Sequence, residues 1–287
     1  MNYTYVTDYK DNNKYRKSFN ELTEKTYGFN LEDWYQEGLW GDTYIPYSLL
    51  DGDKVIANVS ANLMEFDRKG VIKNYVQIGT VMTDDDYRGQ GLSRFLMEKV
   101  IEEYKNKSDG IYLFANDSVV NFYPKFGFEI SQQYQFSKKI PLSKNITTIE
   151  VVDLTNKNHW NNFFDVVKGR ISNCSFEMNN PGLTGFWTRW SKSVYYHPQE
   201  DAYVVADVNE GTLYIKEIFA EHKINLDAII SSFGDKIKEV TLGFTPCNSD
   251  GYSINEYKEE DSTLFILGSD LNNIEDMKLI FPILSHA

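Results

Sequence analysis

The chain has 287 residues, 41% of them hydrophobic, and 42 acidic against 29 basic residues give a net charge of −13. This length is comfortable for two compact cores. The acidic balance runs against nucleic-acid binding, which needs a cationic surface to displace counterions from phosphate. No segment approaches the ~20 apolar residues that span a bilayer, and the N-terminus lacks a signal-peptide pattern. We therefore expect a soluble cytoplasmic protein with neither a nucleic-acid nor a membrane partner.

The two cysteines, Cys174 and Cys247, are too isolated to indicate a disulfide framework or a metal site. We accordingly expect no bound metal. The acidic surface has two interpretations. It steers a cationic substrate such as an amine toward the protein, or it only keeps the protein soluble.

The first elements along the chain are predicted to be two helices and a group of antiparallel strands. One helical face is formed by Tyr15, Phe19, Leu22 and Thr26, at spacings of four, three and four. A short helix over 31–38 follows, with Asn30 as its N-cap. Alternating apolar residues over 44–66 predict two strands joined by a turn at 51–53, and a further strand spans 74–83.

A strand–helix–strand unit is predicted next. The loop 84–91 leads into an amphipathic helix over 92–106, and the apolar run 110–115 is typical of a buried strand. A brief helix over 118–125 and a strand near 128–138 complete the unit. This order predicts an α+β fold, a mixed α/β architecture with a βαβ element at its centre.

The polar segment 141–148 is predicted to be a linker between two domains, 1–140 and 149–287. In the second half we expect strands at 148–154, 202–207, 212–219, 239–244, 263–267 and 277–281, helices at 160–168 and 226–233, and an irregular stretch at 179–184. This order echoes the first half. The second half is therefore interpreted as a diverged copy of the same fold.

The segment 75–103 carries the chemistry. A strand ends there, a loop turns at Gly89 and Gly91, and a helix begins. A helix start presents unpaired N–H groups and a positive dipole end, which suit an anionic phosphate. Arg88 and Arg94 add cationic donors. The spacing lacks the third glycine of the dinucleotide motif and the Gly-Lys-Ser/Thr of a P-loop. A ligand-free turn is the alternative interpretation.

Two segments resemble motifs of the GNAT superfamily of N-acetyltransferases. Arg88-Gly89-Gln90-Gly91-Leu92-Ser93 is similar to the pyrophosphate loop of motif A, Gln/Arg-x-x-Gly-x-Gly/Ala, although Ser93 stands where glycine or alanine is usual. Serine is small and starts helices well, so we expect binding to be kept. Asn116-x-x-Val119-x-x-Phe122-Tyr123-x-Lys125-Phe126-Gly127-Phe128 resembles motif B.

The resemblance implies an acetyl-coenzyme A-dependent N-acetyltransferase of a two-domain bacterial type. It implies a central mixed sheet flanked by helices, followed by a degenerate GNAT-like domain. The residues it assigns to the cofactor are Val81, Met82, Thr83, Arg88, Gly89, Gln90, Gly91, Leu92, Ser93, Arg94, Asn116 and Ser118. Tyr123 takes the place of the general acid, and Asn116 orients the cofactor or a neighbouring loop.

The general base is left open by the sequence, because residues 77–83 contain no carboxylate. Asp84, Glu65 and Glu32 are candidates. The resemblance to bacterial two-domain relatives of the enhanced-intracellular-survival type adds a chain-terminal carboxylate at Ala287. His286 beside it is a further candidate.

The acceptor site is predicted around Phe29, Glu32 and Trp34, because aromatic rings beside carboxylates suit an organic cation. Ordinary core packing is the alternative interpretation of these aromatics. The function expected is acetyl transfer to a primary amine of a small, cationic molecule. A protein acetyltransferase and an acetyl-coenzyme A sensor without turnover are the alternatives. The second half keeps no Arg-Gly-x-Gly loop, so it is expected to wall the cleft or to form a homodimer.

Overall fold

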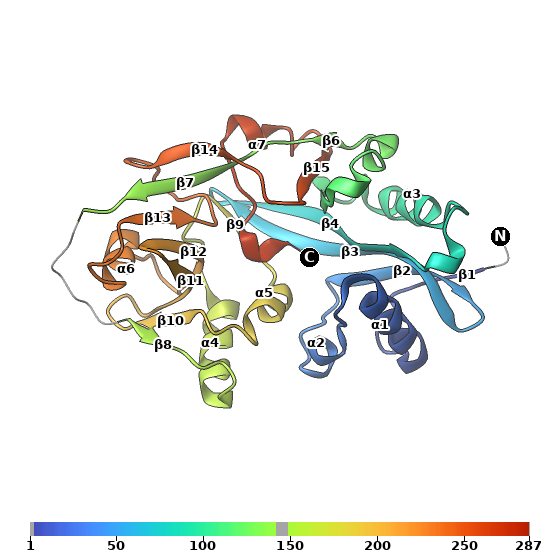
Figure 1. Ribbon diagram of the computed structural model, residues 1–287, viewed down its shortest axis with the longest axis horizontal. Coiled ribbons are helices and arrows are strands. Elements are labelled where there is room, and N and C mark those ends of the chain that lie inside the picture. The colour runs from blue at the N-terminus through green and yellow to red at the C-terminus, as the bar shows by residue number, and fades with distance from the viewer. Residues whose placement is uncertain (1–2, 142–148, 287) are drawn as a thin grey trace.

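The computed structural model describes residues 3–141 and 149–286, which form two neighbouring β-sheets with helices packed against them (Figure 1). In the first sheet the strand order is β1-β2-β3-β4-β5-β15-β6, and β9 pairs with β3. Its strands are β1 (Thr4–Thr7), β2 (Tyr44–Asp51), β3 (Lys54–Arg68), β4 (Val71–Thr83), β5 (Gly110–Ala115), β6 (Glu129–Ile130), β9 (Phe176–Asn179) and β15 (Thr263–Leu267).

The second sheet has the order β14-β7-β13-β12-β11-β10-β8. Its strands are β7 (Gln133–Lys139), β8 (Glu150–Val151), β10 (Val194–His197), β11 (Ala202–Asn209), β12 (Thr212–Phe219), β13 (Glu239–Leu242) and β14 (Ser253–Tyr257). The mixed α/β class expected from the sequence is confirmed.

Helices cover both faces of the first sheet, and the helix over 226–232 packs in the core of the second sheet. The helices are α1 (Asn13–Tyr27), α2 (Glu32–Gln36), α3 (Leu92–Tyr104), α4 (Lys157–Gly169), α5 (Pro181–Thr188), α6 (Leu226–Ser232) and α7 (Asn273–Asp276). On one face, Leu96 and Met97 of α3 pack against Val59 and Ile78. On the other, α1 and α2 pack in a cluster that also holds side chains of α4 and the second sheet. The two halves therefore share one apolar interior beside α1.

Each sheet contains one parallel pair built around a helix. In the first, β4 and β5 run parallel with α3 between them in sequence. In the second, β12 and β13 run parallel with α6 between them. The strands that precede each parallel pair are antiparallel, β2-β3-β4 and β10-β11-β12. The two sheets thus repeat one arrangement, as the element order suggested.

The two halves exchange strands. β15, from the second half, lies beside β5 in the first sheet, and β7, from the first half, lies beside β13 in the second. The chain passes from the first sheet to the second within residues 131–132 and returns to the first within 258–262, and between these points β9 also joins the first sheet. The boundaries 1–140 and 149–287 thus do not follow the sheets, because alternation within a strand does not encode which neighbour it pairs with. Residues 142–148 of the expected linker lie outside the described residues.

Two of the predicted segments were wrong. Residues 277–281 form no strand; Leu279 and Phe281 are instead fully buried core side chains. The stretch 179–184, expected to be irregular, contains the start of α5. The Asn180 side chain accepts a hydrogen bond from the Leu183 amide (3.1 Å), and Pro181 occupies the first helical turn. An Asn-Pro pair is a helix-start signal that the polar composition of the stretch obscured.

Candidate active site

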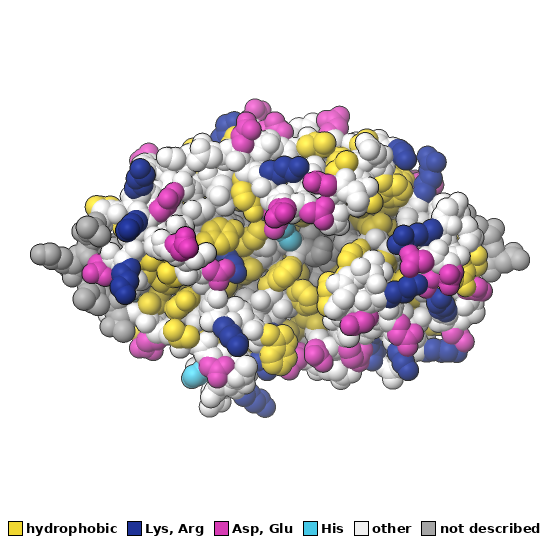
Figure 2. Space-filling model, in the orientation of Figure 1, with side chains coloured by type: hydrophobic (Ala, Val, Ile, Leu, Met, Phe, Trp, Pro, Cys, Tyr) yellow, Lys and Arg dark blue, Asp and Glu magenta, His cyan; other side chains and the backbone are white. Residues whose placement is uncertain are grey.

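One cleft of about 1010 Å³ lies between the two halves. Hydrophobic side chains gather around the middle of this face (Figure 2). The lining residues come from β4, the start of α3, the segment after β5, the α1–α2 region, α5 and His286. Every expected cofactor residue except Gln90 lines it, and so do Tyr123, Phe29 and Trp34. The fold therefore gathers nearly all of the sequence-predicted site in one place.

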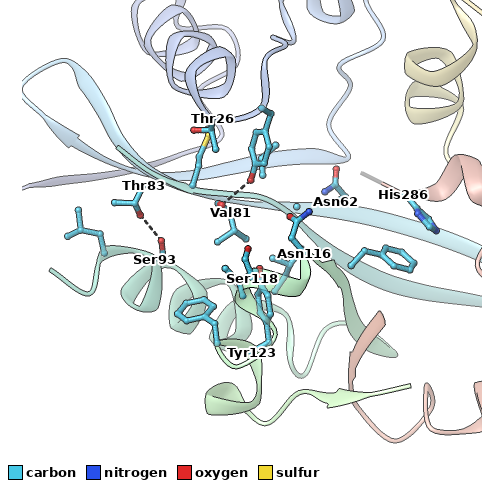
Figure 3. A pocket seen from close by; sticks show the side chains of 18 of the residues that line it. Thr26, Asn62, Val81, Thr83, Ser93, Asn116, Ser118, Tyr123 and His286 are labelled. Atoms are coloured by element: carbon cyan, nitrogen blue, oxygen red, sulfur yellow. Dashed lines mark hydrogen bonds between the residues drawn. The ribbon is translucent and has the colours of Figure 1, made fainter. Parts of the chain in front are cut away.

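The cleft opens where β4 and β5 separate. They pair only over 75–77 and 110–112, and beyond this β5 continues to pair with β15 on its other side. The last part of β4 therefore keeps a free edge toward the cleft. Tyr27 donates a hydrogen bond to the Val81 carbonyl (3.0 Å), which fixes the orientation of this peptide unit (Figure 3).

A β-bulge at Thr80, in the β3–β4 pairing, lies just beyond the last β4–β5 pair. Thr80 has φ of 43°, an unusual value for a β-branched residue, and the β3–β4 register shifts between Asn58 and Ser60. Buried hydrogen bonds hold the strained residue: its hydroxyl donates to Ser60 Oγ (2.7 Å), and Asn58 Nδ2 donates to its carbonyl (2.9 Å). The Tyr44 hydroxyl, at the cleft, lies 2.7 Å from Thr80 Oγ1.

The loop after β4 leaves a helix start free for an anion. Gly89 and Gly91 both have φ of 76°, which favours glycine, and nothing lies within 4 Å of a Cβ built at either position. Within the part of the chain that is described, no side chain caps α3. Its first amides are therefore available to phosphate oxygens. Ser93, the departure from the motif, lies 2.6 Å from Thr83 through the two hydroxyl oxygens and ties the helix to β4 (Figure 3).

Arg88 and Arg94 are exposed at the same end of the cleft. The Arg88 guanidinium lies 2.9 Å from Asp85, and the Arg94 guanidinium lies 3.2 Å from Glu98. Surface ion pairs of this kind contribute little to stability, so each arginine can exchange its carboxylate partner for a phosphate at a small cost in free energy. Gln90 does not line the cleft; its side chain accepts a hydrogen bond from Tyr3 (3.1 Å).

Tyr123 begins a short 3₁₀ turn after β5 and is 5% exposed. Its ring packs against Phe122, Phe128 and Phe265. Burial raises the pKa of its hydroxyl to about 12, so the phenol keeps its proton at neutral pH. A neutral phenol facing the cleft is suited to donate a proton to an anionic leaving group.

Asn116 is held by a residue that sequence reasoning missed. Its amide nitrogen donates to Asp261 Oδ2 (2.9 Å), and the Asp117 backbone N–H donates to Asp261 Oδ1 (2.7 Å). These bonds lower the pKa of Asp261 and keep it anionic. Asp261 precedes β15, so the exchanged strand brings it to the cofactor side. No local sequence signal links residues 116 and 261.

Most base candidates are already engaged elsewhere. Asp84 is buried and paired with Lys54 (2.9 Å) and Lys25 (3.3 Å), which lower its pKa. Glu65 accepts a hydrogen bond from Asn179 (2.8 Å). Neither lines the cleft. Ala287 lies outside the described residues.

His286 does line the cleft, at the end opposite Thr83 and Ser93 (Figure 3). Its Nδ1 lies 3.3 Å from Glu259, and its ring stacks on Phe114 with centroids 3.7 Å apart. Its backbone carbonyl accepts a hydrogen bond from Trp187 Nε1 (2.8 Å). The hydrogen bond to His286 lowers the pKa of Glu259. Among the described residues Nε2 is buried and has no hydrogen-bond partner, and Nδ1 is oriented by the Glu259 carboxylate.

Glu32 does not reach the cleft. Its carboxylate is held by Arg16 (3.0 Å), Asn20 (2.9 Å) and Gln36 (2.7 Å), and the contact with Arg16 lowers its pKa. These bonds anchor α2 to α1. Glu32 therefore positions Trp34 rather than contacting a ligand in the cleft.

The second half supplies the opposite wall. Leu183, Phe186 and Trp187 of α5 line the cleft. α5 is fixed against the first half because Trp34 Nε1 donates to the Gly182 carbonyl (2.8 Å). A Cβ at Gly182 would lie 2.5 Å from the Leu39 carbonyl oxygen, so this close approach requires glycine.

Comparison with known proteins agrees with this geometry. Residues 11–128 match the acetyltransferase (GNAT) family. GCN5-related N-acetyltransferase 2 of Arabidopsis thaliana chloroplasts is 43% identical over 53 residues, which cover 18% of this chain and 20% of that protein. The chain thus spans about a fifth of the curated relatives it matches.

The match to the GNAT family covers the segment that holds β4, the glycine loop and α3. Two solved structures are similar to almost all of the chain. One is an Enterococcus faecalis V583 protein described as a probable N-acyltransferase, with a TM-score of 0.58 and 18% identity, covering 93% of this chain and 71% of that one. The other is Eis1 of Mycobacterium abscessus, with a TM-score of 0.58 and 11% identity, covering 91% and 73%. At these identities the likeness concerns the fold.

The second half has a much smaller cavity at the corresponding place. At the corresponding end of β12 only about 20 Å³ remains, bordered by Asn173, Cys174, Glu177, Glu217, Ile218, Ile224, Leu226, Phe244 and Pro282. The Asn225 side chain caps α6 by accepting from the Ala228 amide (3.2 Å). The anion position that α3 leaves open is therefore filled by the protein at α6.

In the described residues, no helix is long and apolar enough to cross a membrane. Over the same ranges, no group of three or more His, Cys, Asp and Glu side chains is arranged to hold a metal ion.

Proposed function

We propose that the protein is an acetyl-coenzyme A-dependent N-acetyltransferase that acts on the primary amine of a small molecule. The observation that carries this is that one cleft combines an uncapped helix start, an open strand edge and a buried neutral tyrosine. The helix start suits the anionic phosphates of the cofactor, and the strand edge suits its thioester arm. The neutral tyrosine suits the leaving thiolate, which needs a proton.

Acetyl-coenzyme A supplies the activated acetyl group, and this chain supplies its positioning. The α3 amides and the glycine loop suit the pyrophosphate, and the free edge of β4 over 81–83 suits the pantetheine arm. A backbone N–H of Val81 or Met82 polarises the thioester carbonyl. The Tyr27 hydroxyl donates a hydrogen bond to the Val81 carbonyl oxygen. This bond keeps the Val81 oxygen from repelling the negative charge that develops on the thioester oxygen.

Proton movements are assigned to two side chains. The neutral amine attacks the carbonyl carbon, a C–N bond forms and the C–S bond breaks. Tyr123 gives its hydroxyl proton to the departing sulfur. His286, oriented by Glu259, accepts the proton that the amine loses. Of the base candidates within the described residues, His286 alone lines the cleft.

The small size of the acceptor is supported by the wall that α5 places across the cleft. A protein lysine needs an open groove for its flanking chain, and this wall narrows the approach. Glu32, one of the carboxylates on which the expectation of a cationic acceptor rested, is bound to Arg16 outside the cleft.

Calorimetric titration with acetyl-coenzyme A, followed by a thiol-release assay over an amine panel, tests the proposal. We expect binding and turnover. Binding without turnover on any amine or lysine peptide would favour a sensor. Turnover on peptides in preference to small amines would favour a protein acetyltransferase. Absence of binding would overturn the proposal.

A further inference from the structure

The acceptor end of the cleft is bordered by aromatic rings from both halves. We call the following five residues the aromatic wall: Tyr27, Phe29, Trp34, Phe186 and Trp187. Their rings touch in succession: the centroids of Tyr27 and Phe29 are 6.0 Å apart, those of Phe29 and Phe186 are 6.1 Å apart, and those of Phe186 and Trp187 are 5.3 Å apart. The wall is therefore continuous across the junction of the two halves.

Part of this wall is left uncovered. Trp34 is 8% exposed, but Tyr27 and Phe29 are each 41% exposed and Trp187 is 44% exposed. Ordinary core packing would cover all five rings. Exposed aromatic faces that continue into the proposed cofactor cleft indicate a ligand whose own flat surface completes the packing.

Within residues 3–141 and 149–286, no Asp or Glu side chain lines this region as a partner for a polycation. The acids near its rim are already paired: Glu32 with Arg16, Glu37 with Arg189 (3.6 Å) and Glu259 with His286. A ring face can attract one ammonium group, but a molecule with several charges would have to desolvate the others without counterions.

Polar groups suited to an amine lie at the end of the wall beside Trp187. His286 stacks on Phe114, and its carbonyl is bound by Trp187 of the wall itself. Asn62, with 3% exposure, also lines this end (Figure 3). The arrangement matches a molecule with one nitrogen at its end and an apolar body behind it.

We infer that the acceptor is a monoamine whose nitrogen is carried on a flat apolar body, such as an aryl-ethylamine, and not a polyamine or an amino sugar. This inference rests on the proposed transferase function and names the substrate class of the same site. Its chemical basis is the uncovered aromatic wall, together with the absence of Asp and Glu side chains from the described cleft lining.

The test compares kcat/KM for tryptamine and phenylethylamine with that for spermidine and kanamycin at saturating acetyl-coenzyme A. We expect kcat/KM to be about tenfold higher or more for the aryl amines. The stacking of one ring and the desolvation of one further charge each change kcat/KM by about tenfold. Equal or better use of spermidine or kanamycin would overturn the inference while leaving the transferase function intact.

Three variants of the intact chain sharpen the test. Phe29→Ala is expected to raise KM for tryptamine about tenfold with unchanged affinity for acetyl-coenzyme A. Phe29→Glu is expected to shift the preference toward spermidine, because it places a carboxylate on the wall. Trp190→Ala is the matched control: Trp190 is 60% exposed, stacks on Arg189 and does not line the cleft. Equal KM values in all three variants would overturn the role of the wall.

Direct binding separates the two proposals if no amine turns over. Calorimetric titration of tryptamine in the presence of coenzyme A then reports on the wall alone. Binding that Phe29→Ala abolishes and Trp190→Ala preserves would support the acceptor class, although the transferase function would have failed. Absence of tryptamine binding in the unmodified protein would overturn the inference.

Discussion

The two halves contain the same β–α–β arrangement, but the first has a far larger cavity at its centre than the second. At the end of β4 the chain turns through two glycines, and no side chain of the described residues caps α3. At the end of β12 the chain carries no glycine before Asn225, which caps α6. The cleft is about 1010 Å³ in the first half, and about 20 Å³ remains in the second.

Charged side chains occupy the place of the ligand in the second half. Arg170 pairs with Glu177 (3.2 Å) in the interior, and the carboxylate oxygens of Glu217 have no hydrogen-bond partner within the described residues. Burial raises the pKa of Glu217 to about 8. The two sheets therefore share one topology, whereas the presence of a ligand site depends on a few residues at one helix start.

The largest expected effect is on cofactor binding. Gly91→Glu places a side chain where φ is 76° and a negative charge beside the phosphates. We expect the Kd for acetyl-coenzyme A to rise by about a hundredfold or more in calorimetry. Lys223→Glu, in the corresponding loop of the second half, is the control and should leave Kd unchanged. Unchanged binding in Gly91→Glu would remove the distinction between the two helix starts.

A smaller effect is expected for the proposed acid. Tyr123→Phe removes only the hydroxyl, so we expect kcat to fall by about a hundredfold while the Kd for acetyl-coenzyme A stays constant. Because its pKa is raised to about 12, the tyrosine should cause no loss of activity between pH 7 and 10. Tyr47→Phe, at a buried tyrosine outside the cleft, is the control. Full turnover by Tyr123→Phe would contradict the assignment.

The proposed base is tested in the same assay. His286→Gln is expected to lower kcat by about 10- to 100-fold, and Glu259→Gln by about 3- to 10-fold, because the glutamate acts only through the histidine. Raising the pH should partly restore the activity of the His286→Gln variant, because more of the amine is then neutral in solution. His222→Gln, outside the cleft, is the control. Activity that is equal in His286→Gln and His222→Gln at all pH values would exclude this role.

The second half offers a test that concerns stability alone. The folded pKa of Glu217 is raised above its unfolded value, so its contribution is most favourable below about pH 4.5 and is lost as the pH rises through about 8. Glu217→Gln should therefore stabilise the protein increasingly between pH 5 and 8, by roughly 1–3 kcal/mol. Chemical denaturation across this range measures it, with exposed Glu256→Gln as control. A pH-independent difference would contradict a buried, protonated Glu217.

The sequence by itself determined the parts of the site that depend on local backbone geometry. The loop Arg88–Ser93 lies on the expected strand-to-helix turn, because glycine spacing and the strand-to-helix change are local features. The segment Asn116–Tyr123 follows β5 as expected, but it contains 3₁₀ turns where one helix over 118–125 was predicted. Whether each of these residues serves the cofactor or the reaction stays a prediction.

Only the tertiary structure decided what surrounds these segments. The exchange of β7 and β15, the placement of Asp261 on Asn116, the α5 wall and the pairing of His286 with Glu259 join residues far apart in the chain. A local pattern specifies which face of a strand or helix is buried, but not which distant partner covers it. For the same reason Glu32, which stands beside the aromatics in sequence, is turned toward Arg16 by packing that its neighbours do not encode.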